Sequence, residues 1–348
     1  MFGSLSAWVS HCKQIASVED EASELECEVS YCNQKLEVLK SDYLIKLESE
    51  IEEQDVQVPV PLKRFKLSGC DRPVAKHHTL GQRQTVEDLN TLVETSNFAS
   101  LGKIQPFLVS IQMPALVVID IHCSLTNSEV VGYLGGTWDV NSHTLIIQKA
   151  YPCLARLGET NTATVENSIR EAMGVDNVSL VGWYHSHFSA SPTPTVRDID
   201  AQLDYELRMK TTGDLSYRPC IGLICSPYYR SDTSHTSLNS SVSCFWVSPP
   251  PESRPHDLAR PMAMQHSVTF DQSLNDDILH QIDQCIKYYQ DAPDFIEMEQ
   301  EWADGITVLD KLKSSLSSKF RDQADVRLMN LLYTLLKKEQ PKNSFLLS

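Results

Sequence analysis

The stretch Val181-Gly182-Trp183-Tyr184-His185-Ser186-His187 combines a buried-strand pattern with two closely spaced histidines. Residues 178–184 are rich in Val, Leu, Trp and Tyr, a composition typical of a strand inside a sheet. Because side chains alternate along a strand, His185 and His187 are predicted to project from the same face. Two imidazoles on one face can bind a metal ion together.

Asp198 is predicted to complete this candidate site. It follows His187 by eleven residues, beyond a Ser/Pro/Thr loop, and falls in the first turn of an amphipathic helix expected over residues 196–209. That turn can bring a carboxylate back to the imidazoles. Two imidazoles and one carboxylate leave the fourth tetrahedral position of zinc open to water, which is typical of catalytic zinc sites and not of structural ones.

Glu129 is the candidate general base. It opens the segment 129–136, which otherwise has the apolar pattern of a strand, and a carboxylate there must be solvated, paired or functional. At a metal site it would take a proton from water and return it to a leaving amine. Ser186 should project from the opposite strand face and take no part in the chemistry. A chance His-x-His pair is the simple alternative, since the chain has 11 histidines.

The combination of Glu129, His185-Ser186-His187 and Asp198 resembles the JAMM motif of the MPN-domain zinc metalloproteases (the JAMM/MPN+ family), over about residues 106–250. The resemblance implies an α/β fold of the MPN, or cytidine-deaminase-like, type: a mixed-sheet domain flanked by helices. It also implies Zn²⁺ as the cofactor and ubiquitin or a ubiquitin-like conjugate as the substrate.

Two positions differ from the usual pattern of that family. Phe188 stands where Pro is usual, and Thr195 stands where Ser is usual. The resemblance implies that the hydroxyl at this second position helps to stabilise an oxyanion, and Thr195 keeps a hydroxyl. We therefore expect Thr195 to act beside Glu129 in catalysis.

The apolar patterns predict alternating strands and helices within the domain at 106–250. His122, in an expected helix, should be a structural histidine with its hydrogen bonds satisfied, and His143 should lie solvated in a turn. The expected strands are 107–112, 129–136, 144–153, 178–187, 219–226 and 242–248, and the expected helices are 114–122, 164–173 and 196–209.

Residues 251–348 are predicted to form a helical C-terminal extension. Apolar residues recur at helical spacing within 274–289, 302–316 and 326–336. These helices either cover the catalytic domain or offer an interface to a partner protein. Covering is the favoured interpretation, because amphipathic stripes are the ordinary signal of packing against a core.

The N-terminal part has two predicted sections. Residues 1–50 resemble part of a RAMA domain, a module associated with binding DNA that carries methylated adenine, but their four Lys/Arg and ten Asp/Glu oppose DNA binding. Residues 51–105 are predicted to be a polar linker with one short helix at 86–96. Within it, the basic run 63–66 resembles a short nuclear-import signal.

Composition bounds the environment of the protein. The net charge is −16 and the pI about 5.1, which disfavours nucleic acid as a general partner. The 10 cysteines include no Cys-x-x-Cys pair and are predicted to be buried and reduced. Neither a long apolar run nor a signal-peptide pattern occurs, so we expect no membrane contact and an intracellular, nuclear and/or cytoplasmic location.

These patterns favour a zinc metalloprotease of the isopeptidase or deubiquitinase type that works without a covalent enzyme intermediate. The loops at 156–162 and 229–240 are candidates for substrate contacts. Two other classes stay open: a non-catalytic interaction module built on the MPN fold, and a sensor of adenine-methylated DNA.

Overall fold

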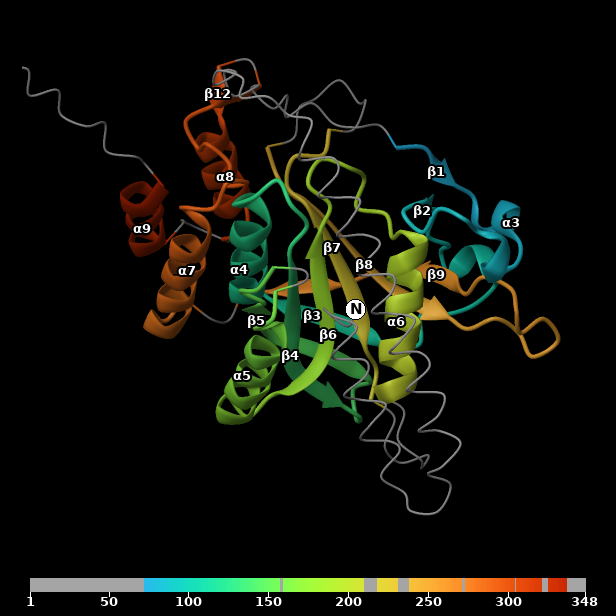
Figure 1. The fold of residues 1–348 in the computed structure, drawn as a ribbon. Coiled ribbons are helices and arrows are strands. Elements are labelled where there is room, and N and C mark those ends of the chain that lie inside the picture. Colours follow the sequence, from blue (N-terminus) through green and yellow to red (C-terminus); the bar gives the residue numbers. More distant parts are fainter. Residues whose placement is uncertain are drawn as a thin grey trace, which may run out of the picture. The chain divides into compact units, whose positions relative to one another are not determined.

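The computed structural model describes residues 72–156, 159–209, 218–230, 238–270, 273–303, 305–320 and 325–336. They are built around a mixed sheet of eight strands (Figure 1). From one edge to the other the strands are β10 (Ser267–Thr269), β3 (Leu108–Gln112), β5 (Thr144–Pro152), β4 (Val131–Asp139), β6 (Ser179–Ser186), β7 (Ile221–Ser226), β8 (Ser241–Ser248) and β9 (Arg260–Ala263).

Strand β6 lies in the middle of this sheet. It pairs with β4 in antiparallel and with β7 in parallel orientation, and Val131 of β4 lies opposite His185. Six of its eight residues are buried, as expected for a strand covered on both faces. The predicted mixed α/β class is confirmed.

Helices cover both faces of the sheet. They are α4 (Met113–Ser124), α5 (Thr162–Val175), α6 (Val196–Met209), α7 (Asp276–Tyr289), α8 (Val308–Ser317) and α9 (Val326–Leu336). Helix α4 is buried along its whole length, because it lies between the sheet and helices α7 and α8 (Figure 1). Helix α6 covers the other face.

The alternation of side chains along β6 explains these two layers. Tyr184 packs in the core that contains α4, whereas its neighbour Trp183 packs against Val196 and Ile199 of α6. The Tyr184 ring lies across Gly132 of β4 so closely that a Cβ at this position would collide with the ring. A glycine is therefore required where the two strands meet.

Most of the predicted elements are present with similar bounds, but several expectations are wrong. Strand β4 begins at Val131, so Glu129 precedes the strand and does not open it. Residues 302–303 and 306–307, predicted as helix, lie in two antiparallel strands, β11 (Glu301–Ala303) and β12 (Ile306–Thr307). Gly305 has a φ of 78°, in the left-handed region that favours glycine.

Residues 72–105 belong to the folded unit, contrary to the predicted linker. They form β1 (Val74–Ala75), α3 (His77–Leu80), η1 (Arg83–Thr85), β2 (Leu92–Val93) and η2 (Ala99–Leu101), with no helix at 86–96. Leu92 and Val93 are fully buried, and Val93 N–H donates to the carbonyl of Pro194 at 2.8 Å. This short segment can bury apolar side chains because α6 supplies a surface for Val93 to pack against. The RAMA-like segment and the basic run 63–66 lie outside the described residues.

The C-terminal part also differs from the predicted boundary at residue 250. Strands β9 and β10 lie beyond it and form the two edges of the main sheet, so this part is not purely helical. Helices α7 and α8 share one hydrophobic core with α4 and the sheet. In the structure these helices cover the domain, and an interface to a partner protein stays a prediction.

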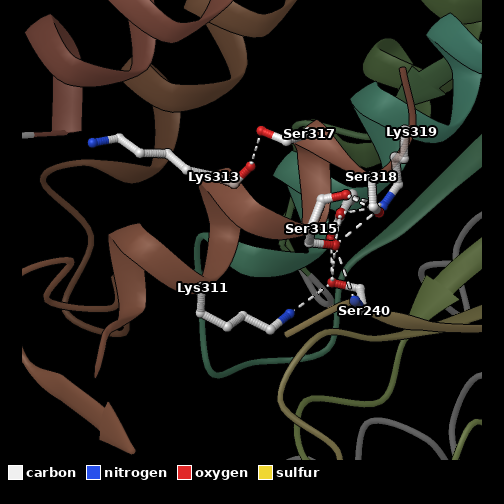
Figure 2. Close-up of polar contacts among 8 residues, drawn as sticks. Ser240, Lys311, Lys313, Ser315, Ser317, Ser318 and Lys319 are labelled. Carbon is white, nitrogen blue, oxygen red and sulfur yellow. Dashed lines mark hydrogen bonds and ion pairs between the residues drawn. The ribbon is translucent and has the colours of Figure 1, made fainter. Parts of the chain in front are cut away.

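A buried polar cluster ties α8 to α4. Asp120 of α4 accepts from Lys319 Nζ and from Ser315 Oγ, both at 2.6 Å. Lys311, 1% exposed, donates to Ser240 at 2.8 Å (Figure 2). Burial opposes ionisation of Asp120, but the two lysines outweigh it and lower its pKa to about 2. The cluster fixes the C-terminal helices to the sheet domain.

Six cysteines lie in the described part of the chain, all of them free and buried, which agrees with their prediction as small core residues. They are Cys123, Cys153, Cys220, Cys225, Cys244 and Cys285. Among the same residues, no helix combines the length and apolar character that a membrane crossing needs.

Candidate metal centre

The structure brings His185, His187 and Asp198 together at the end of β6. The Nε2 atoms of His185 and His187 are 3.2 Å apart. Asp198 Oδ2 lies 3.3 Å from His185 Nε2 and 3.5 Å from His187 Nε2. In the described part of the chain, this is the group of ligand-type side chains close enough to hold one metal ion.

The donor set fits zinc. With Zn–N and Zn–O bonds of roughly 2.0–2.1 Å, two ligand atoms of a tetrahedral site are separated by about 3.3 Å. The three separations in the cluster, 3.2, 3.3 and 3.5 Å, bracket that value. The side chains of His185 and Asp198 are 0% and 3% exposed and that of His187 is 10% exposed, so His187 marks the open side of the site.

The loop after β6 fixes the tautomer of His187. Its Nδ1 lies 2.9 Å from the carbonyl oxygen of Ser191. A carbonyl can only accept, so Nδ1 carries the proton of the neutral ring and donates it to Ser191. The lone pair of Nε2 therefore points into the cluster, as metal coordination requires.

Stacking on Trp183, its neighbour two residues earlier in β6, fixes the His185 ring. The ring stacks on Trp183 with centroids 4.8 Å apart and an interplanar angle of 13°. Trp183 Nε1–H in turn donates to Gln202 at 2.9 Å. The Nδ1 atom of His185 is buried and has no hydrogen-bond partner among the described residues.

Electrostatics couples the three ligand residues. Burial alone would lower the pKa of His185, but the Asp198 carboxylate, with a smaller contribution from Glu129, raises it above the usual value. Burial would raise the pKa of Asp198, but the two imidazoles hold it well below its usual range. A carboxylate kept ionised beside two imidazoles has the charge that a divalent cation needs.

Thr195 and Asp198 form a reciprocal cap at the start of α6. Thr195 N–H donates to Asp198 Oδ2 at 2.7 Å, and Asp198 N–H donates to Thr195 Oγ1 at 3.2 Å. Because Oγ1 accepts in this cap, its own O–H proton is not used in it. Thr195 thus orients the carboxylate of Asp198.

Glu129 lies beside this cluster, without belonging to it. It is exposed, it precedes β4, and the strand it leads into places Val131 opposite His185. Continuing that register would bring Glu129 opposite His187, and its charge is felt at His185. Glu129 is therefore an exposed carboxylate close enough to His185 for its charge to affect the pKa of that residue.

Two further residues near the cluster, His122 and Ser186, make buried hydrogen bonds. His122 is a structural histidine, as predicted: its ring nitrogens lie 2.8 Å from the Tyr184 hydroxyl and 3.0 Å from the Tyr289 hydroxyl. Ser186 was expected to take no part in the chemistry, and its Oγ makes a structural contact: it accepts from Val130 N–H at 3.0 Å. The sequence signal for this bond is weak, since it consists only of a small hydroxyl residue between two histidines.

Phe188, which replaces the usual Pro, has a packing role. Its ring contacts that of Tyr228 with centroids 5.1 Å apart, and its carbonyl accepts from Tyr228 N–H at 3.1 Å. The substitution therefore leaves the loop after His187 attached to the body of the domain.

A similar protein, and not a family model, places the chain in a family, since no family model matches it. It is 34% identical over 372 residues to the MPN domain-containing protein of Danio rerio, covering 98% of this chain and 80% of that protein. The mixed sheet and this relative define a protein of the MPN class. The chain belongs to the MPN domain-containing protein family.

Two further relatives are longer than the chain. The MPN domain-containing protein CG4751 of Drosophila melanogaster is 40% identical over 342 residues, which are 96% of this chain and 24% of that protein. The human protein named Deubiquitinase MYSM1 is 33% identical over 155 residues, which are 44% of this chain and 18% of that protein. The chain thus spans about a quarter of the fly protein and a smaller part of the human one.

Proposed function

We propose that this chain is a zinc-dependent isopeptidase that removes ubiquitin or a ubiquitin-like modifier. The observation that carries the proposal is the cluster of His185, His187 and Asp198, whose separations of 3.2 to 3.5 Å suit one tetrahedral ion. The 33% identity to a protein named as a deubiquitinase supports the substrate class.

Each residue of the site would have a separate role in hydrolysis. His185, His187 and Asp198 would hold the zinc, which supplies Lewis acidity toward the scissile carbonyl and lowers the pKa of water. Glu129 would accept the proton of the attacking water and deliver it to the leaving lysine amine. Thr195 would donate a hydrogen bond from its hydroxyl to the developing oxyanion.

The test is cleavage of a panel of ubiquitin and ubiquitin-like conjugates by the full chain and its Glu129→Gln variant, with zinc measured in both. Glutamine keeps the size of the side chain but cannot accept the proton. We expect unchanged zinc content and a loss of roughly 10²- to 10⁴-fold in cleavage rate. Equal cleavage by both proteins contradicts the proposed role of Glu129 and the hydrolytic mechanism built on it.

Failure of the zinc-loaded chain to cleave any conjugate would favour the other MPN function, an interaction module without catalysis. That outcome is distinguished from a missing cofactor by the same zinc measurement. Binding of adenine-methylated DNA stays a separate prediction, tested by comparing methylated and unmethylated duplexes with the full chain and with a chain lacking residues 1–50.

We also propose a nuclear and/or cytoplasmic location. The basic run 63–66 in the sequence supports nuclear import. A fluorescent fusion of the full chain should concentrate in the nucleus and lose this concentration when Lys63, Arg64 and Lys66 are replaced by Ala. An unchanged distribution would remove the proposed role of this run.

A further inference from the structure

The segment at residues 125–130, which carries Glu129, is fixed at two points by residues far away in the sequence. Glu129 itself is exposed, and its carboxylate therefore depends on its backbone for its position. A displacement of about 1 Å in a reacting group can cost on the order of 10²-fold in rate. The contacts that hold this backbone are therefore relevant to catalysis.

The first anchor is Ser186, which lies between the two histidines and is 1% exposed. Its N–H donates to the carbonyl of Val130 at 3.0 Å, and its Oγ accepts from Val130 N–H at 3.0 Å. One residue thus satisfies both backbone groups of Val130, directly after Glu129. Without the hydroxyl, the N–H of this buried residue would lose its partner.

The second anchor is Asp294, in the turn that follows α7. Its carboxylate accepts from Thr126 Oγ1 at 2.6 Å, and its backbone carbonyl accepts from Asn127 N–H at 3.1 Å. Thr126 Oγ1 also accepts from Ser128 N–H at 3.2 Å. The chain leading to Glu129 is thus attached to the C-terminal part of the protein.

Asp294 is itself held firmly. Arg156 binds its carboxylate through both guanidinium NH₂ groups, one of them at 2.6 Å from Oδ1, and the Arg156 guanidinium lies over the Tyr289 ring. Beside it, Ile296 N–H donates to the carbonyl of Leu125 at 2.9 Å. The turn after α7 therefore forms a fixed support and not a loose contact.

We propose that Ser186 and Asp294 are positioning residues for Glu129, and that the C-terminal segment is for this reason a working part of the catalytic unit. This inference rests on the proposed function, in which Glu129 is the general base. Neither residue touches the metal ligands' coordinating atoms in the structure, so each acts through the backbone of residues 125–130.

Hydrogen exchange tests the anchors without any requirement for activity. In the full chain, Ser186→Ala should speed exchange of the Val130 amide about tenfold, the effect of losing one hydrogen bond. Asp294→Ala should speed exchange over residues 125–128 to a similar extent. Ser142→Ala and Asp176→Asn are matched controls in hydrogen-bonded positions elsewhere, and they should leave these peptides unchanged. Unchanged exchange in both test variants overturns the inference.

Kinetics then separates positioning from general loss of structure. With zinc content equal to wild type, Ser186→Ala and Asp294→Ala should each lower kcat about tenfold or more with KM nearly unchanged. Ser186→Thr, which keeps the hydroxyl, should restore kcat. In the Glu129→Gln background the two substitutions should have no further effect, because the group they position is gone.

Different results would overturn the positioning role and the proposed function. If Glu129→Gln abolishes cleavage with zinc still bound while Ser186→Ala and Asp294→Ala retain full kcat, the positioning role is overturned and the proposed function stands. If Glu129→Gln cleaves like the wild type, the proposed function is overturned, and the inference that depends on it falls too.

Discussion

Thr195 and Asp198 hold each other by two reciprocal hydrogen bonds, from Thr195 N–H to Asp198 Oδ2 at 2.7 Å and from Asp198 N–H to Thr195 Oγ1 at 3.2 Å. The same pair caps α6 and orients the carboxylate of the metal cluster. Helix capping and metal binding are therefore coupled at this position.

Replacing the capping hydroxyl should reduce both stability and zinc retention. Thr195→Val keeps the shape of the side chain but cannot cap, and we expect a loss of about 1 kcal/mol in the free energy of unfolding. Zinc should also be lost faster on dialysis against a chelator. Thr195→Ser, which restores the usual residue of the family, should match the wild type in both measurements. Equal stability and zinc retention in the Val variant would show that the cap is unimportant.

His122 should make stability depend on pH. Burial, with a smaller contribution from Arg156, lowers its pKa to about 3 from the usual value of 6.5. In the unfolded chain the His122 imidazole is therefore protonated below about pH 6.5, whereas in the folded chain it is protonated only below about pH 3. Stability should fall across this window, by on the order of a few kcal/mol.

Urea unfolding between pH 3 and pH 8 checks this expectation. The His122→Gln variant should lack this part of the pH dependence, although it is less stable at neutral pH. His143→Gln is a suitable control, because His143 lies exposed in a turn. Parallel curves for the wild type and His122→Gln would contradict a neutral buried imidazole.

The polar cluster around Asp120 should be sensitive to loss of its carboxylate. Asp120→Asn leaves Lys311 and Lys319 without their anionic partner, which should destabilise the protein by about 3 kcal/mol. The pKa of Asp120 is about 2, below that of an unfolded carboxyl, so its contribution is present above about pH 4 and disappears toward pH 2. The destabilisation should therefore be largest near neutral pH.

A surface ion pair provides the control for this comparison. Asp283 pairs with Lys287 at 2.8 Å on the exposed side of α7, where the lysine side chain is 56% exposed. Asp283→Asn should change stability by less than about 1 kcal/mol. Similar losses of stability in Asp120→Asn and Asp283→Asn would mean that burial does not make the Asp120 cluster more important to stability than a surface ion pair.

Thiol reagents should not inhibit cleavage, because the proposed mechanism uses no cysteine nucleophile. Burial raises the pKa of the Cys220, Cys244 and Cys285 thiols, which lowers their reactivity. Treatment of the folded protein with iodoacetamide should leave its rate unchanged, whereas a zinc chelator should abolish it. Full inhibition on modification of a single cysteine would contradict the metal mechanism.

The sequence alone predicts those parts of the structure that depend on local periodicity. Alternation of apolar residues identifies β6, amphipathic spacing identifies α6, and together they place His185, His187 and Asp198 near one another. The two histidines are placed by their i, i+2 spacing on a strand, and Asp198 is placed by the first turn of the next helix. Both features are local and do not depend on distant contacts.

Features that depend on tertiary partners could not be predicted in this way. Val93 is buried in a core cluster that includes Val196 and Ile199 of α6, and the bond between Ser186 and Val130 depends on the register of β4 with β6. The spacing of Trp302 and Ile306 fits a helix as well as the observed pair of strands, and Gly305 has a φ in the left-handed region that favours glycine. The support of the Glu129 segment by Asp294 joins parts of the chain about 170 residues apart and leaves no local pattern.

The most direct test of the central claim is the metal content of the purified full chain, measured by elemental analysis beside a His185→Ala/His187→Ala variant and a His143→Ala control. We expect close to one zinc per chain in the wild type and the control, and its loss in the double variant. A metal centre at this site would be contradicted if the wild type, purified with zinc available, carries none. It would also be contradicted if the double variant keeps its zinc.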